Sequence, residues 1–459
     1  MVTYLLLYGT ILLNLFSETG QTYYISSTGN DNNSGTSSQS AWRSLEKINK
    51  LTLRKGDKVL LEGGKIYAGN IRLDEKDGGD SIGKVIISSY GKGKPIIDAG
   101  KGTGIFVYNT AGISISNIIV KGSGVSDNNG CGIHCYADAI SEKLSGITIN
   151  NCETTGFRGY GILIQSDKDT TCGFRNVRII NCIATENGEA GIGSLAAYPA
   201  VSHQNFYISN CKAFTNRGIL TKTDNHSGNG IVLSGVKFFL IDSCEAYENG
   251  ADCRSVSGGP VGIWVWHCHS GIIQNSHAQH NHAGTCLHDG GGFDIDGGSS
   301  GCIIRNCISN DNEGAGYLVC EFGSPLPFTN NIVENNSSRN DGLKNGYGAI
   351  TLSGAVKEYP VTNTTIRNNK IVVENRNVVD GIPSAIFFNN SDCRNIYFEN
   401  NSFEIGAGAL VLRTDSLCDQ QQVVFKKNQF VTKENRFTVI CTKCGTTNEN
   451  FWKERLSKK

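Results

Sequence analysis

The sequence predicts an all-β solenoid of about ten coils, in which one chain winds through stacks of short parallel strands. Two repeating patterns predict this fold. A short polar motif of three residues, such as Asn150-Asn151-Cys152, recurs at intervals of 29 to 33 residues. Inside each repeat, a small residue begins a segment in which apolar side chains alternate, and alternation is typical of strands with one buried face. Because a single coil cannot bury its apolar face alone, the coils must stack around one continuous core.

The chain begins with a segment, residues 1–20, that is predicted to be a cleaved signal peptide. Its apolar runs are short and interrupted, which favours a secretion signal over a membrane span. No later stretch of the sequence is long and apolar enough to cross a bilayer. We therefore expect a secreted, extracellular protein.

Residues 21–54 differ from the repeats and are predicted to cover the open end of the solenoid. A strand at 23–26 and a turn-rich segment at 29–36 precede a short amphipathic helix at 41–49. A solenoid needs such a cap because its terminal coil would otherwise expose the apolar core.

The repeats occupy residues 55–435, and residues 436–459 are expected to form a C-terminal cap or tail. Equivalent motif positions should stack in columns. The third motif position is held by Cys152, Cys182, Cys211, Cys244, Ser276, Cys307, Asn336, Asn369 and Asn401. The position before it is also mostly Asn, as in Asn151, Asn181 and Asn210. Asn tolerates left-handed backbone and can hydrogen-bond along such a column. The cysteines are expected to form a buried ladder of small residues rather than disulfides, and one cysteine per coil is not a zinc pattern.

The capping segment, the opening of the first coil at 55–61 and the repeats together resemble the right-handed parallel β-helix proteins of the pectin-lyase-like class. The resemblance covers about residues 22 to 440. It implies a single-stranded right-handed parallel β-helix in which outward side chains of one sheet line a cleft for a sugar chain. The activities within this class are diverse, so the fold alone does not name the reaction.

Asp294 and Asp296 are predicted to point outward from one strand, because Phe293 and Ile295 alternate with them and take the inward positions. The equivalent strand one coil later ends at Glu321, one position beyond the place that matches Asp296. Neighbouring coils are about 4.8 Å apart. Paired carboxyl groups suit glycoside hydrolysis, in which one donates a proton and the other attacks or activates water. Asp296 is the candidate nucleophile or base and Glu321 the candidate acid, with Asp294 in support, and the two roles can be exchanged. The Gly-rich segment 291–298, followed one coil later by Glu321, resembles β-helical glycoside hydrolases in which Asp and Glu from adjacent coils act as a pair.

Aromatic and polar side chains around these carboxylates are expected to bind the sugar. Indole faces give sugar rings an apolar platform, and glycines let the backbone approach a ligand closely. The candidate substrate-binding residues are Trp264, Trp266, His267, His288, Asp289 and Arg254. Glu189, several coils away, is interpreted as a turn residue. Cysteines cluster in the same coils, where one or two disulfides could join loops without the sequence fixing their pairing: Cys253, Cys268, Cys286, Cys302 and Cys320.

The charge balance excludes two classes of binding protein. Lys and Arg number 42, and so do Asp and Glu. A nucleic-acid-binding protein needs a basic field, and a polybasic membrane binder needs an excess of cations. We expect a polysaccharide or glycan partner, no nucleic acid, no membrane span and a monomer, with no cofactor or metal for the hydrolase.

Two alternatives to the glycoside hydrolase remain open at this stage. A polysaccharide lyase of the same fold would need a basic residue and a cation such as calcium, which Asp289, Asp294 and Asp296 could hold. Arg254 is the only nearby basic candidate for that reaction. A non-catalytic carbohydrate-binding surface protein would instead use Trp264 and Trp266 to stack sugars, and it would not be an enzyme.

Overall fold

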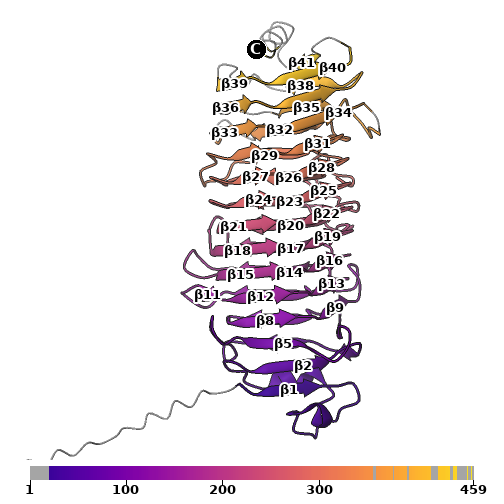
Figure 1. Ribbon diagram of the computed structural model, residues 1–459, viewed down its shortest axis with the longest axis vertical. Coiled ribbons are helices and arrows are strands. Elements are labelled where there is room, and N and C mark those ends of the chain that lie inside the picture. Colours follow the sequence, from indigo (N-terminus) through magenta and orange to yellow (C-terminus); the bar gives the residue numbers. More distant parts are fainter. Residues whose placement is uncertain are drawn as a thin grey trace, which may run out of the picture.

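The computed structural model of the chain is an all-β parallel solenoid of about twelve coils (Figure 1). The fold-class prediction is confirmed, with about two more coils than the sequence motif suggested. The structure describes residues 20–354, 358–375, 377–389, 392–414, 422–434 and 438–441, with Trp452 and Leu456. The predicted signal peptide, apart from Gly20, and most of the segment 436–459 lie outside the described residues. Within the described part of the chain, no helix has the length and apolarity needed to cross a membrane.

Three parallel sheets run the length of the solenoid, and each coil contributes a strand to each sheet in turn. The first sheet contains β1 (Thr22–Ile25), β2 (Lys58–Glu62), β5 (Val85–Tyr90), β8 (Ile113–Ser116), β12 (Ile147–Asn150), β15 (Phe174–Ile180), β18 (His203–Ser209), β21 (Val236–Asp242), β24 (Ile272–Gln274), β27 (Ile303–Arg305), β30 (Ile332–Glu334), β33 (Val361–Arg367), β36 (Cys393–Glu399) and β39 (Val423–Lys426), with β11 (Leu144–Ser145) paired to β15.

The second sheet is built from shorter strands. It contains β3 (Ile66–Ala68), β6 (Ile96–Gly100), β9 (Ile119–Gly122), β13 (Glu153–Thr155), β16 (Ile183–Thr185), β19 (Lys212–Phe214), β22 (Glu245–Tyr247), β25 (His277–Gln279), β28 (Ile308–Asn310), β31 (Ser337–Arg339), β34 (Lys370–Val373), β37 (Ser402–Ile405) and β40 (Gln429–Thr432).

The third sheet carries the alternating segments that the sequence pattern identified. It contains β4 (Ile71–Leu73), β7 (Ile105–Tyr108), β10 (Ile133–Ala137), β14 (Tyr160–Ser166), β17 (Ala190–Ala196), β20 (Asn229–Ser234), β23 (Val261–Trp266), β26 (Gly291–Ile295), β29 (Tyr317–Glu321), β32 (Gly348–Gly354), β35 (Ser384–Asn389), β38 (Leu410–Thr414) and β41 (Val439–Cys441).

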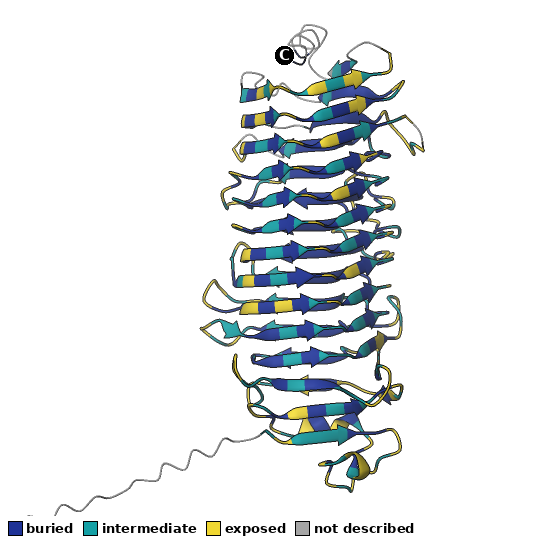
Figure 2. Cartoon of the chain, in the orientation of Figure 1, coloured by how far each residue is buried: buried dark blue, intermediate teal, exposed yellow. Residues whose placement is uncertain are grey.

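Alternation along the strands builds the core. In β12, Ile147 and Ile149 are fully buried while Thr148 between them is partly exposed, and neighbouring coils repeat the pattern (Figure 2). Parallel pairing keeps inward residues in register, so that Ile149 lies level with Ile115 and Ile179. Stacking of equivalent apolar side chains in this way produces one continuous core along the axis.

The corners between the first two sheets explain the polar motif. Asn151, Asn181 and Asn210 adopt left-handed backbone, with φ of 53°, 56° and 52°, as the sequence predicted for these turns. In the next column the buried Cys152 and Cys182 thiols donate to backbone carbonyls, which confirms the small-residue ladder. Where asparagine replaces cysteine, amide side chains hydrogen-bond from coil to coil.

The N-terminal cap differs from the expected helix at 41–49. The structure has two short 3₁₀ helices, η1 (Ser38–Ser40) and η2 (Leu45–Lys50), and Leu45 and Ile48 of η2 are buried against the core. Trp42 forms a parallel bridge with Ile25 and is therefore extended rather than helical. Tertiary pairing has overridden the local helical pattern here, while the capping contact of η2 is retained.

Candidate active site

The outward face of the third sheet is hollowed by a cavity of about 1100 Å³. Its lining extends along the solenoid axis from Thr103 to Asn389. Both polar groups and apolar side chains reach it, as is usual for sites that bind small organic ligands. A cavity of this length and volume can hold several sugar units.

Two tryptophans of β23 line the cavity, as the alternation predicted. Trp264 is only 5% exposed, because its indole Nε1 donates to Asn229 Oδ1 at 3.1 Å and its ring meets His226 edge-on. Trp266 is more exposed and packs near Phe322. The structure therefore offers one fixed indole and one more accessible indole to a ligand.

Asp296 lies at the end of β26 and points into the cavity. Its backbone N–H donates to Val265 O at 2.8 Å, which continues the parallel pairing with β23. Burial, together with the charges of Asp289 and Glu321, raises the pKa of Asp296 to about 7, although the Gly297 N–H and the Cys320 thiol favour its ionised form. The carboxyl group is therefore about half protonated near neutral pH.

Asp289 reaches the same cavity from the loop that precedes β26. Its backbone is left-handed, with φ of 53°, and Gly290 follows with φ of 81°, so the chain turns back sharply. Asp289 Oδ2 accepts from Gly259 N at 2.8 Å, and Oδ1 accepts from the Tyr347 hydroxyl at 3.1 Å. These bonds fix the carboxylate in position while burial raises its pKa.

Asp294 points outward from β26 as predicted, but it lies behind the cavity rather than on its surface. It is 3% exposed, and its Oδ1 has no hydrogen-bond partner in the described part of the chain. Burial first, and then the charges of Asp296 and Asp289, raise its pKa well above the usual range. Three coupled acids in one place must share protons, because they cannot all ionise at neutral pH.

The structure does not bring Glu321 to the cavity, and here the sequence hypothesis needs correction. Val319 pairs with Ile295, so Cys320 lies level with Asp296 and the side chain of Glu321 points to the other face. Its carboxylate accepts from Gly298 N at 3.0 Å, Gly323 N at 2.7 Å and Ser324 N at 2.6 Å. Glu321 is 1% exposed and holds a loop together.

The remaining predicted residues divide in the same way. His288 is exposed and lines the cavity, but His267 is buried, with its Nε2 2.9 Å from Ser324 Oγ. Arg254 is exposed and does not line the cavity. Among the described residues, which include the aspartates considered for calcium, no group of three or more His, Cys, Asp or Glu side chains is arranged so that it could hold a metal ion.

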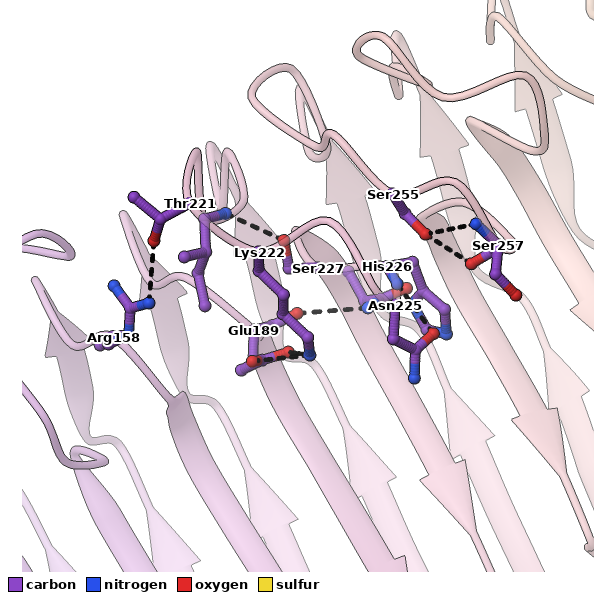
Figure 3. Close-up of polar contacts among 11 residues, drawn as sticks. Arg158, Glu189, Thr221, Lys222, Asn225, His226, Ser227, Ser255 and Ser257 are labelled. Carbon is purple, nitrogen blue, oxygen red and sulfur yellow. Dashed lines mark hydrogen bonds and ion pairs between the residues drawn. The ribbon is translucent and has the colours of Figure 1, made fainter.

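The lining of the cavity also contains an ion pair that the sequence did not reveal, between Lys222 and Glu189 (Figure 3). Lys222 Nζ lies 2.7 Å from Glu189 Oε2, and both line the cavity, so Glu189 is not simply a turn residue. Lys222 belongs to the loop 215–228 between β19 and β20. The loop is held by Arg158 bonded to Thr221 at 3.1 Å and by an internal bond from Ile219 N to Ser227 Oγ. The long repeat between Cys211 and Cys244 was the available signal for this loop.

Two loops at the rim of the cavity meet through cysteines. Cys253 Sγ and Cys286 Sγ are 2.9 Å apart, and Cys286 is three residues from Asp289. Both thiols are free and buried. The structure thus identifies which of the clustered cysteines face one another, a pairing that the sequence left open.

Comparison with known proteins supports the fold. The family model for the right-handed beta helix region matches residues 220–371. A lacto-N-biosidase of Bifidobacterium longum subsp. longum is 39% identical over 87 residues, which are 18% of this chain and 5% of that protein. The matched residues therefore span only a small part of this curated relative.

Two solved structures share the architecture at low sequence identity. The GH136 lacto-N-biosidase of Eubacterium ramulus superposes with a TM-score of 0.60 and 17% identity, covering 92% of this chain and 68% of that one. The Dettilon tailspike protein superposes with a TM-score of 0.50 and 14% identity, covering 84% of this chain and 62% of that one. These similarities establish the right-handed parallel β-helix.

Proposed function

We propose that the protein is a carbohydrate-active enzyme, a glycoside hydrolase that uses Asp289 and Asp296 as its carboxyl pair. The observation that carries this proposal is the convergence of both carboxyl groups, with raised pKa values, on a cavity lined by Trp264 and Trp266. Asp289 replaces Glu321 as the partner of Asp296. The similarity to lacto-N-biosidases supports the proposal, and it makes glycans with a terminal lacto-N-biose unit the first substrates to test.

The pair can perform both proton transfer and stabilisation of the sugar cation. At neutral pH the protonated carboxyl donates its proton to the leaving oxygen. The ionised carboxyl attacks the anomeric carbon or activates water. The indoles of Trp264 and Trp266 pack against the C–H faces of the ring, so the scissile bond is held between the two acids. Burial raises the pKa of Asp294 well above its usual range, so this carboxyl holds a proton behind the pair.

The polysaccharide lyase finds less support. A lyase needs a base beside the acidic sugar and a cation or other group to neutralise it. Among the cavity-lining residues that the structure describes, Lys222 is the only lysine or arginine, and its ammonium group is ion-paired with Glu189. We also propose that residues 1–20 direct secretion, so that the enzyme would meet its glycan outside the cell.

The test is product release from lacto-N-tetraose and from a wider glycan panel by wild-type protein, Asp289→Asn and Asp296→Asn. Wild-type protein should release reducing sugar, and each variant should lose this activity. Asp98→Asn, an exposed aspartate in β6 of the second sheet, is the matched control and should retain full activity. Binding without cleavage by wild-type protein would identify a carbohydrate-binding protein instead. An unsaturated product absorbing in the ultraviolet would identify a lyase.

A further inference from the structure

The outward face of the third sheet continues beyond the cavity as an aromatic surface toward the N-terminus. Phe106 and Tyr108 lie on β7, and His134 and Tyr136 lie on β10. Register pairs Phe106 with His134 and Tyr108 with Tyr136, so the four rings form a compact square on two adjacent coils. We call these four residues the aromatic platform. All four are partly exposed, because they occupy outward positions that alternate with buried core residues.

The rings of the platform are ordered by contacts with one another. The centroids of Phe106 and Tyr108 are 5.9 Å apart with their planes at 17°, and those of Tyr108 and Tyr136 are 6.0 Å apart at 26°. The guanidinium carbon of Arg72 lies 5.0 Å from the Phe106 centroid and closes the N-terminal side. The His134 ring is tilted by 58° against Phe106 and by 44° against Tyr136. Rings held by such contacts form a preorganised apolar surface, which loses little conformational entropy when a ligand binds.

Polar groups border the platform on the side of the next coil. The Tyr136 hydroxyl donates to Asp167 Oδ2 at 3.1 Å, and Gln165 Nε2 donates to Asp167 Oδ1 at 2.9 Å. His134 Nε2 lies 3.0 Å from Gln165 Oε1. Apolar ring surface beside hydroxyl, amide and carboxylate groups matches the chemistry of a sugar, whose rings have C–H faces and hydroxyl edges.

The platform is continuous with the cavity. His134 belongs to the platform and also lines the cavity, and Gln165 on β14 does the same for the polar border. Both surfaces lie on one face of one sheet and follow one axis. A linear glycan bound in the cavity could therefore extend over the platform without crossing a corner of the solenoid.

We propose that the aromatic platform is a distal binding site for the further sugar units of the same glycan whose terminal part occupies the cavity. This inference rests on the proposed function for the identity of the glycan. It predicts that affinity rises with chain length, since only a longer oligosaccharide reaches Tyr108 and Tyr136. Loss of one ring should reduce that gain roughly two- to tenfold.

The experiment compares two linear oligosaccharides, lacto-N-tetraose and para-lacto-N-hexaose, by calorimetric titration. The protein carries Asp289→Asn so that no ligand is hydrolysed. Tyr136→Ala and Tyr108→Ala are then added separately, because one of them could disturb folding. Phe214→Ala is the matched control: Phe214 stacks on Tyr247 at 4.8 Å, but on the second sheet and away from the cavity.

The proposal expects tighter binding of the longer sugar, loss of that difference in the tyrosine variants, and no change in Phe214→Ala. Equal binding of both sugars, or a difference that survives both tyrosine variants, would overturn it. The hydrolase proposal is tested separately, by cleavage of lacto-N-tetraose with proteins that retain Asp289. If Tyr136→Ala still cleaves lacto-N-tetraose and binding does not depend on the length of the sugar, the platform proposal is wrong and the hydrolase proposal stands. If length-dependent binding depends on Tyr136 but wild-type protein cleaves nothing, the platform stands and the hydrolase falls.

Discussion

Two buried polar regions of this solenoid differ in how completely their hydrogen bonds are satisfied. One region is a ladder of buried asparagines at the corner between the second and third sheets, and it ends at Asp341. Its members are Asn187, Asn216, Asn249, Asn281 and Asn312. Each amide donates to the next and to a backbone carbonyl, so no cost of burial is left uncompensated. The carboxyl cluster of Asp289, Asp294 and Asp296 instead contains a buried carboxyl oxygen, Asp294 Oδ1, with no hydrogen-bond partner among the described residues.

The difference separates residues that stabilise the fold from residues held for chemistry. Even Asp341, the one acid in the ladder, has partners for both oxygens: Asn312 bonds Oδ1 at 2.7 Å and Ser338 bonds Oδ2 at 2.6 Å. Folding tolerates an under-satisfied acid cluster only where other contacts outweigh it, and such sites are usually functional. The ladder and the cluster should therefore respond in opposite ways to mutation.

The largest expected effect is on catalysis. Asp296→Asn should lower kcat by on the order of a thousandfold, because it removes a carboxyl that must donate a proton or attack. The free energy of unfolding should not fall, since a buried charge is removed. Steady-state kinetics and thermal unfolding of the same preparation check both parts. An active Asp296→Asn protein would contradict the assignment.

The next effect concerns the ladder. Asn249→Ala should lower the free energy of unfolding by about 2 kcal/mol, because it leaves the Asn216 backbone N–H and amide without their acceptor. Specific activity of the folded protein should be retained. Denaturant unfolding measures the change, and Asn70→Ala, at an exposed position, serves as the control. Loss of activity at unchanged stability would show that the ladder is not purely structural.

Both regions should contribute to the pH dependence of stability, because burial raises the pKa of Asp341 in the ladder to about 6 as well. The pKa of Asp296 is about 7 in the folded protein and about 4 when unfolded. The folded state thus binds more protons between these values, so its contribution to stability is full below about pH 4 and is lost as pH rises through about 7. Asp296→Asn should flatten this decline. Hydrolysis should likewise fall as pH rises through about 7, because the cluster loses its shared proton. A rate that keeps rising in that range would contradict the account.

The smallest effect is expected from Glu321→Gln. Its carboxylate accepts three backbone N–H bonds, and an amide oxygen can replace only part of them. We expect a loss of about 1 kcal/mol in stability and less than about a tenfold change in kcat, well below the effect of removing a catalytic acid. A loss of activity as large as that of Asp296→Asn would restore the original pairing of these two residues.

The periodic parts of the molecule could be predicted from the sequence, because period-two alternation and a fixed repeat length determine which residues stack. The sheets, the left-handed Asn corners, the Cys ladder and the outward direction of Trp264 and Asp296 follow from that rule. Glu321 lies outside the lining of the cavity because a shift of one residue along a strand reverses the face.

Residues on irregular loops could not be placed in the same way. Asp289 reaches Asp296 only because its left-handed backbone and Gly290 turn the loop back, and its anchor Tyr347 is 58 residues away in sequence. Lys222 meets Glu189 through a loop whose path depends on tertiary contacts with Arg158. No local sequence pattern encodes these contacts, so the loop residues that line the cavity could be identified only in the folded structure.

The most direct test of the account measures hydrolysis of lacto-N-tetraose and the midpoint of thermal unfolding for Asp296→Asn and Asn249→Ala in parallel. We predict that Asp296→Asn abolishes hydrolysis with an unchanged or higher midpoint, and that Asn249→Ala lowers the midpoint while its folded fraction still hydrolyses the substrate. If Asp296→Asn lowered the midpoint and kept its activity, the carboxyl cluster would be structural and the central claim would be wrong.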